Sequence, residues 1–319
     1  MGGTTKRLRL IYGDLTLGVA GEGYHCIFNY MLGGLESLVK DGREWIYRAP
    51  RPTFWRALTD NDRGSRFHLQ SGMWLAADTF IRVTGARVAV DGQDIPLPIA
   101  PENNRYTPDE FAGSVSLTFE FETITVPAAR VAVTYALEAG KGMTVTAHYF
   151  GQAGLPQLPV FGLRFVMPTM ARGFTYEGLS GETYPDRMDG GIPGVYHVDG
   201  LPVTPYLVPQ ECGMHMDTRW VEIERDTQLS NVRQDGVSTL RIEQAGKPFA
   251  FSCLPYTAGE LENATHQEEL PPARRTVLCV CGAVRGVGGI NSWGADVERA
   301  YHIDAAQDHE VSFVIALEY

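Results

Sequence analysis

The stretch Val115-Ser-Leu-Thr-Phe-Glu-Phe121 alternates apolar and polar residues without a break. Successive side chains of a β-strand point to opposite faces, so this period of two predicts a strand with one buried face. The alternation returns at residues 131–137 and again at 143–149. Neighbouring strands of this kind are typical of an antiparallel sheet that lies on a hydrophobic core.

Strand patterns also recur along the remaining chain. They are shorter, and they lie at residues 160–166, 220–223, 239–242, 250–254, 276–284 and 310–317. Helical patterns are confined to residues 70–79 and to a short run after Thr257, which is expected to cap it. No internal repeat and no Pro/Ser-rich linker divides the chain. The sequence therefore predicts a single all-β domain over residues 1–319, a large antiparallel β-sandwich with long loops.

The composition excludes several classes of protein. Of the 319 residues, 44% are hydrophobic and 20% are charged, which is typical of a folded globular chain. The net charge of −11 would repel phosphate backbones, so no nucleic-acid partner is expected. No apolar stretch approaches the ~18 residues of a membrane span, and the amino-terminal decapeptide has no apolar core of signal-peptide length. We therefore expect a cytoplasmic protein with no membrane partner.

The cysteines do not indicate a disulfide framework or a metal site. Their number, five, is odd, and the chain is long. Cys279 and Cys281 share one face of the strand predicted at 276–284, and the other three cysteines supply no regularly spaced zinc ligands. We predict core thiols at these two positions and no metal.

Three predicted loops have unusual sequences. In Phe54-Trp-Arg-Ala-Leu-Thr-Asp-Asn-Asp-Arg-Gly64 the acidic residues superficially resemble a calcium loop, but residues 65–73 contain no carboxylate to complete it. A turn held by side-chain hydrogen bonds and Arg–Asp pairs is favoured. The polar and aromatic loop at 176–187 fits equally a sugar-contacting loop or a surface loop pinned by Asp186 and Arg187.

The third loop, Arg285-Gly-Val-Gly-Gly-Ile-Asn-Ser-Trp-Gly294, places a tryptophan among glycines. Its glycines do not form a dinucleotide-binding motif, because no helical pattern follows them. One interpretation is an exposed indole that offers an apolar platform to a sugar face. The alternative is a tryptophan that covers the edge of the core.

These loops also carry a resemblance to a known family. Four motifs resemble, in the same order, the C-terminal domain of large β-galactosidases; they lie at residues 54–64, 184–187, 205–213 and 286–294. The similarity runs from about Tyr12 to the C-terminus. Three longer segments resemble more narrowly the small subunit of two-gene, heterodimeric β-galactosidases, namely 176–188, 200–216 and 254–298.

The resemblance implies a fold of the galactose-mutarotase-like supersandwich type and a non-catalytic subunit of a retaining glycosidase. The two catalytic glutamates of such an enzyme belong to the barrel of the large subunit, so no catalytic residue is assigned to this chain. The implied partners are the large subunit, in a heterodimer or a higher assembly, and a galactoside such as lactose. No cofactor is implied in this chain.

The resemblance also implies which residues line the substrate pocket. Trp293 corresponds to the family's sugar-stacking tryptophan. The remaining substrate-binding candidates are Asn291, Ser292, Glu182, Tyr184, Asp186 and Arg187. The chain departs from the family at Ile290, where many relatives carry an acidic residue, and at Leu58, which replaces the usual proline.

Two other functions stay open on the sequence. The first is an aldose 1-epimerase-like enzyme, which needs a histidine facing a carboxylate in a concave pocket; the candidates are His197, His215, His266 and His302. The second is a stand-alone carbohydrate-binding module, which would have no glycosidase partner. Fold similarity alone does not decide between these functions.

Overall fold

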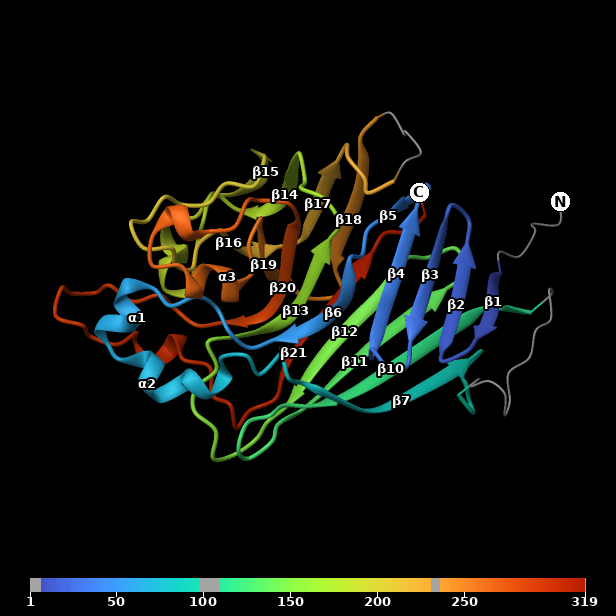
Figure 1. Ribbon diagram of the computed structural model, residues 1–319, viewed down its shortest axis with the longest axis horizontal. Coiled ribbons are helices and arrows are strands. Elements are labelled where there is room, and N and C mark those ends of the chain that lie inside the picture. The colour runs from blue at the N-terminus through green and yellow to red at the C-terminus, as the bar shows by residue number, and fades with distance from the viewer. Residues whose placement is uncertain (1–6, 98–109, 231–235, 319) are drawn as a thin grey trace.

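The computed structural model of the chain describes residues 7–97, 110–230 and 236–318 (Figure 1). Residues 1–6 lie outside the described residues. They are part of the amino-terminal decapeptide from which we predicted that no signal peptide is present. The strands pair antiparallel in each of the three sheets. The all-β antiparallel fold that the alternating pattern predicts is therefore confirmed.

The largest sheet has ten strands in the order β15-β14-β17-β18-β21-β12-β11-β10-β7-β8. At its centre lie the three strands predicted from strict alternation, and Val115 pairs with Leu137 in the register of the first two. Its strands are β7 (Arg82–Val90), β8 (Gln93–Ile95), β10 (Ser114–Glu122), β11 (Arg130–Glu138), β12 (Met143–Phe150), β14 (Gly173–Leu179), β15 (Pro193–Asp199), β17 (Trp220–Arg225), β18 (Ser238–Gln244) and β21 (His309–Ile315).

Two smaller sheets complete the fold. The six-stranded sheet has the order β5-β4-β3-β2-β1-β9, and the five-stranded sheet has the order β16-β19-β20-β13-β6. The strands of the first are β1 (Leu8–Gly13), β2 (Thr16–Gly21), β3 (Tyr24–Asn29), β4 (Gly34–Lys40), β5 (Arg43–Glu44) and β9 (Phe111–Ala112). Those of the second are β6 (Arg48–Thr53), β13 (Val160–Met167), β16 (Met214–Thr218), β19 (Phe249–Leu254) and β20 (Thr276–Val284).

The two smaller sheets lie side by side and cover one face of the ten-stranded sheet (Figure 1). Aromatic rings join the layers: Phe28 packs on Tyr135 with ring centroids 5.4 Å apart, and Phe165 packs on Phe313 at 6.0 Å. One hydrophobic cluster extends along the chain from Leu8 to Leu317. Burial of the apolar face of each strand is the main stabilising term in such a core.

The five-stranded sheet brings two of the unusual loops to one edge. Both β6 and β20 pair antiparallel with β13, which lies between them. They therefore run in the same direction, and the segments that follow Thr53 and Val284 leave the sheet at the same end. Figure 1 shows the result, with α1 (Asp60–Gly64) beside the orange loop that follows β20.

Helices are few and short. Besides α1 they are α2 (Phe67–Ser71), α3 (Ala258–Asn263) and the 3-10 turns η1 (Gly72–Trp74), η2 (Pro185–Gly190), η3 (Gln267–Glu269) and η4 (Arg299–Tyr301). The predicted cap at Thr257 is confirmed, because its side chain accepts a hydrogen bond from the Glu260 amide. Within the described ranges, no helix has the length and apolar character needed to cross a membrane.

The helix predicted over residues 70–79 is wrong in its bounds. The helical segment starts at Phe67 and ends at Trp74, and Ala76 adopts a left-handed backbone with φ of 62°. Trp74 and Ala77 are both buried, although the left-handed residue Ala76 lies between them.

Trp74 anchors this segment to the sandwich, and we expect its removal to destabilise the folded protein. The indole is fully buried, stacks on Phe54 at 5.6 Å and donates to the Pro156 carbonyl at 3.0 Å. Trp74→Ala should lower the free energy of unfolding in urea by about 3–5 kcal/mol. The same change at Trp293, which is 92% exposed, should cost less than about 0.5 kcal/mol. Equal losses would contradict the structure at Trp293.

Candidate functional site

The first loop is organised by the buried carboxylate of Asp62. This residue lies in α1, and its side chain accepts from the Thr59 amide at 2.9 Å while Thr59 Oγ1 accepts from the Asp62 amide at 3.1 Å. This reciprocal capping box satisfies free amides at the helix start. Arg56 donates to both oxygens of Asp62, at 2.7 and 3.2 Å. The turn with an Arg–Asp pair predicted from the sequence is confirmed.

A second buried guanidinium reaches Asp62 from the third loop. Arg285 follows β20 directly and donates to Asp62 Oδ1 at 3.1 Å, and it also contacts Asp296. Its guanidinium lies 3.9 Å from the ring centroid of Phe67 in α2. Arg56, Asp62 and Arg285 are at most 3% exposed. One buried carboxylate thus ties the loop after β6 to the loop after β20.

Side chains of the second loop (residues 176–187) bind the backbone of the third loop (residues 285–294). Asp186, in η2, accepts from the amides of Val287 and Gly288 at 3.0 and 2.7 Å. Arg187 donates to the Gly288 carbonyl, and Asn61 of α1 donates to the Val287 carbonyl at 2.9 Å. Asp186 and Arg187 thus both bind the glycine-rich loop, and the choice between a sugar-contacting loop and a pinned surface loop stays a prediction.

Close backbone packing requires glycine at two points of this arrangement. A Cβ at Gly286 would lie 2.8 Å from Asp186 Cγ. Gly294 has φ of +78°, and a Cβ there would lie 2.7 Å from the Gly64 carbonyl oxygen. A larger residue at either position would push the third loop away from α1 or η2.

The tip of the third loop points Trp293 into solvent. Its side chain is 92% exposed, so the alternative that it covers the core edge is wrong. Asn291 Oδ1 accepts from the Trp293 amide at 2.9 Å and from the Ala295 amide at 3.3 Å, which fixes the turn that presents the indole. Asn291 and Ser292 are also exposed. The structure therefore brings Trp293, Asn291, Ser292, Asp186 and Arg187 together on connected loops.

The other two candidates lie apart from this tip. Glu182 is exposed and accepts from Thr204 Oγ1 at 2.8 Å. Tyr184 is only 5% exposed, and its hydroxyl donates to Glu211 at 3.5 Å. The phenol therefore supports the second loop from inside and is not placed to touch a ligand at the surface.

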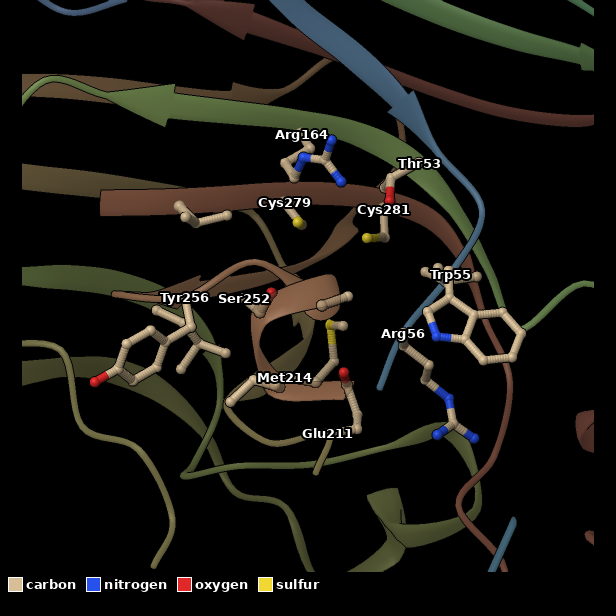
Figure 2. A pocket seen from close by; sticks show the side chains of 15 residues that line it. Thr53, Trp55, Arg56, Arg164, Glu211, Met214, Ser252, Tyr256, Cys279 and Cys281 are labelled. Atoms are coloured by element: carbon tan, nitrogen blue, oxygen red, sulfur yellow. The ribbon is translucent and has the colours of Figure 1, made fainter. Parts of the chain in front are cut away.

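Glu211 lies at a small cavity of about 30 Å³ that is partly open to the surface (Figure 2). Figure 2 shows Glu211 and Met214 on one side of the space and Cys279 and Cys281 of β20 on the other. The volume suits a water molecule or two, and it is far below the several hundred Å³ of typical ligand pockets. This cavity is not a sugar site.

Burial dominates the electrostatics around this cavity. It raises the pKa of Glu211 to about 7, although the nearby Arg56 guanidinium acts in the opposite direction. Burial also raises the pKa of Cys279 to about 11 and raises that of Cys281 well above its usual value, so both are protonated thiols at neutral pH. Neither cysteine is in a disulfide, as predicted for core thiols.

The histidines do not form the pair that an epimerase-like site requires. His197 contacts Asp199 and His266 contacts Glu269, both on the exposed surface. His215 is buried, and its Nδ1 lies 2.8 Å from the Gly181 carbonyl; burial lowers its pKa to about 4. His302 lies 3.4 Å from Asp296, beside the buried Arg285. None of the four lines the cavity of Figure 2.

Sequence reasoning missed several residues that hold the site. Helix α1 was not predicted, although Thr59 and Asp62 have the spacing of a capping box. The contribution of Arg285 had no local signal, because its partner Asp62 is 223 positions away. Gln210 was missed for the same reason; its Oε1 accepts from the Asp60 amide at 2.8 Å. Within the described residues, no group of three potential ligand side chains is placed to hold a metal.

The sequence matches a characterised family along nearly its whole length. The model of the β-galactosidase small chain family matches residues 20–315. The chain belongs to this family. A relative from Latilactobacillus sakei named β-galactosidase small subunit is 61% identical, and the match covers 99% of this chain and 100% of the relative.

Longer proteins named β-galactosidase contain this region as one part of their chain. The β-galactosidase of Halalkalibacterium halodurans is 32% identical over 97% of this chain, and that of Streptococcus thermophilus is 30% identical over 97%. The chain spans only 28% and 27% of these two proteins. The sequence-based resemblance to large β-galactosidases and to the small subunit is thus confirmed.

Solved structures with a similar chain path are more distant. A galactose mutarotase-like protein from Lactobacillus casei aligns over 95% of this chain and 100% of its own, with a TM-score of 0.40 and 10% identity. Galactose 1-epimerase from Lactobacillus acidophilus aligns over 98% and 100%, with a TM-score of 0.39 and 8% identity. Similarity at this level says nothing about activity.

Removing the charge of Asp62 should strongly destabilise the protein. Asp62→Asn keeps the shape of the side chain but leaves two buried guanidinium groups without their shared carboxylate. We expect a loss of about 3–5 kcal/mol in the free energy of unfolding, measured in urea. Asp60→Asn is the matched control, because Asp60 is 73% exposed and its contact with Arg63 is worth less than about 1 kcal/mol. Equal losses of unfolding free energy in the two variants would show that the buried Asp62 network stabilises the protein no more than the exposed contact of Asp60 does.

Glu211 should make stability fall as the pH rises. Its pKa is about 7 in the folded state against 4.5 in the unfolded chain, so the folded state binds the extra proton. The stability that this proton contributes is fully present below pH 4.5 and is lost as the pH rises through about 7. Relative to Glu211→Gln, the wild type should lose a few kcal/mol between about pH 5 and pH 8. Parallel pH profiles in urea unfolding would contradict the burial of this carboxyl.

Proposed function

We propose that this chain is the non-catalytic small subunit of a heterodimeric β-galactosidase and that it completes the substrate pocket of the large subunit. The observation that carries the proposal is the exposed Trp293, held out from the core on a loop that buried groups fix in place. An indole with no partner of its own, in a chain of this family, is suited to a ligand or a partner. The full-length similarity to a small subunit supports the same assignment.

The chemistry of bond cleavage would then come from the partner. A retaining glycosidase uses two carboxyl groups about 5 Å apart, one as acid/base and one as nucleophile. The two acidic residues at the centre of this site have other tasks, because Asp62 neutralises two arginines and Asp186 binds backbone amides. We therefore assign no catalytic residue and no cofactor to this chain.

The contribution of this chain is recognition of the galactoside. The indole of Trp293 offers a broad apolar face to the C–H groups of a sugar ring, and the exposed Asn291 amide and Ser292 hydroxyl offer hydrogen bonds to sugar hydroxyls. Asp186 and Arg187 act as positioning residues, because they bind the backbone of the loop that carries the indole. The preferred substrate class is a terminal β-D-galactoside such as lactose.

The assignment is tested by reconstitution. The small chain alone should not hydrolyse a nitrophenyl galactoside, and the large subunit alone should be much less active than the mixture. A stable complex should form on mixing, because a permanent interface of this type buries on the order of 2,000 Å² or more. Activity of the small chain alone would contradict the proposal. Sugar binding by the small chain without any effect on a large subunit would favour a stand-alone binding module.

Trp293→Ala should lower activity without affecting folding. Loss of one pocket contact is worth about 1–3 kcal/mol, so kcat/KM of the reconstituted enzyme should fall about 5- to 150-fold. Aglycone affinity and transfer to sugar acceptors should weaken most. Trp293→Phe is the control, because it keeps a flat aromatic face and should retain most activity. If both variants were as active as wild type, the indole would not be part of the substrate site.

A further inference from the structure

The segment between α1 and β7 exposes a group of large apolar side chains. They are Leu69, Met73, Leu75 and Phe80, with 71%, 43%, 47% and 61% of their surface exposed. We call them the 69–80 surface. Single exposed apolar residues are normal on proteins, but four within twelve positions of one segment make that segment a candidate for an interaction site.

The same segment is anchored firmly beneath this surface. Phe67 and Trp74 are buried, and Phe67 lies under the Arg285 guanidinium. The exposed side chains are therefore not part of a loosely attached segment that exposes its core by local unfolding. Phe67 and Trp74 pack toward the core and fix the segment in place. The opposite side of α2 and of the turn after it therefore faces solvent, and the exposed apolar side chains lie there.

The 69–80 surface lies next to the proposed substrate loop. Gly64 at the end of α1 packs against Gly294, which directly follows Trp293 in the sequence. Helix α2 begins at Phe67, three residues after Gly64. Figure 1 shows α1, α2 and the loop after β20 at the same end of the molecule. Whatever covers this end of the protein next to Trp293 is therefore in reach of α2.

We infer that the 69–80 surface is a docking site for the large β-galactosidase subunit. This inference rests on the proposed function, because Trp293 can complete the partner's pocket only if the partner lies over this end of the molecule. The relatives that contain this region as about a quarter of a single chain support such a contact. In them the region is joined to a much larger body, against which an apolar surface can be buried.

The surface is suited to a permanent and largely salt-independent contact. Its four members are uncharged, so burial of apolar area and not ion pairing would drive the association. Burying one leucine or phenylalanine changes a dissociation constant by about tenfold or more. A charge placed at either position would instead have to be desolvated on binding.

The test uses a matched pair of leucines. Leu69 is 71% exposed in α2, and Leu229 is 70% exposed in the segment between β17 and β18, where it lies near Glu44 of β5. Leu69→Glu, Phe80→Glu and Leu229→Glu are each mixed with the wild-type large subunit, and the dissociation constant is measured by titration. Thermal melts of each isolated small chain check that the variants fold as wild type does.

We expect Leu69→Glu and Phe80→Glu to weaken the complex at least tenfold and Leu229→Glu to change it less than about twofold. If the wild-type complex forms and is active but all three variants bind as tightly as wild type, the inference is overturned and the proposed function stands. If the wild-type chain does not bind the large subunit, both are overturned. If Leu69→Glu only converts a dimer of the small chain to a monomer, the occupant is a second copy and the inference is also wrong.

Discussion

Asp62 places one negative charge between two buried guanidinium groups, and the functional end of the molecule depends on that arrangement. Removing three charged groups from water costs several kcal/mol for each group unless hydrogen bonds replace the lost hydration. Arg56 and Asp62 lie on the same loop, but the bond from Arg285 to Asp62 can form only when the loop after β6 and the loop after β20 are both in place. The electrostatic requirement thus couples two segments that are far apart in the sequence, and it defines where the glycine-rich loop begins.

The groups that connect this buried network to the tip of the glycine-rich loop are progressively more exposed. Asp186 and Arg187 bind the backbone of residues 287 and 288, and Asn291 then fixes the turn that carries Trp293. The indole itself makes no contribution to the core. A platform for a ligand is most effective when it is held in its bound orientation beforehand, because less conformational freedom is then lost on binding. The buried network supplies that rigidity to an otherwise flexible, glycine-rich segment.

The same arrangement explains why sequence reasoning located the site only in part. The loop sequences were recognisable as unusual, and their resemblance to a family identified Trp293. Tyr184, by contrast, was placed among the ligand-contacting residues because its loop resembles a loop near the family's active site, and the structure buries it against Glu211. Whether an aromatic residue in a loop faces inward or outward depends on what packs beside it, which a short polar motif does not encode.

The sequence by itself determined the all-β class and the positions of strands such as β10, β11 and β12, because the period of two along residues 115–121 is a local property of the chain. It also determined the cap at Thr257, which needs only residues three positions apart. Tertiary structure alone decided that Arg285 and the local Arg56–Asp62 pair meet. Their contact follows from the position of β13 between β6 and β20, and strand order arises from packing among distant segments that no local pattern specifies.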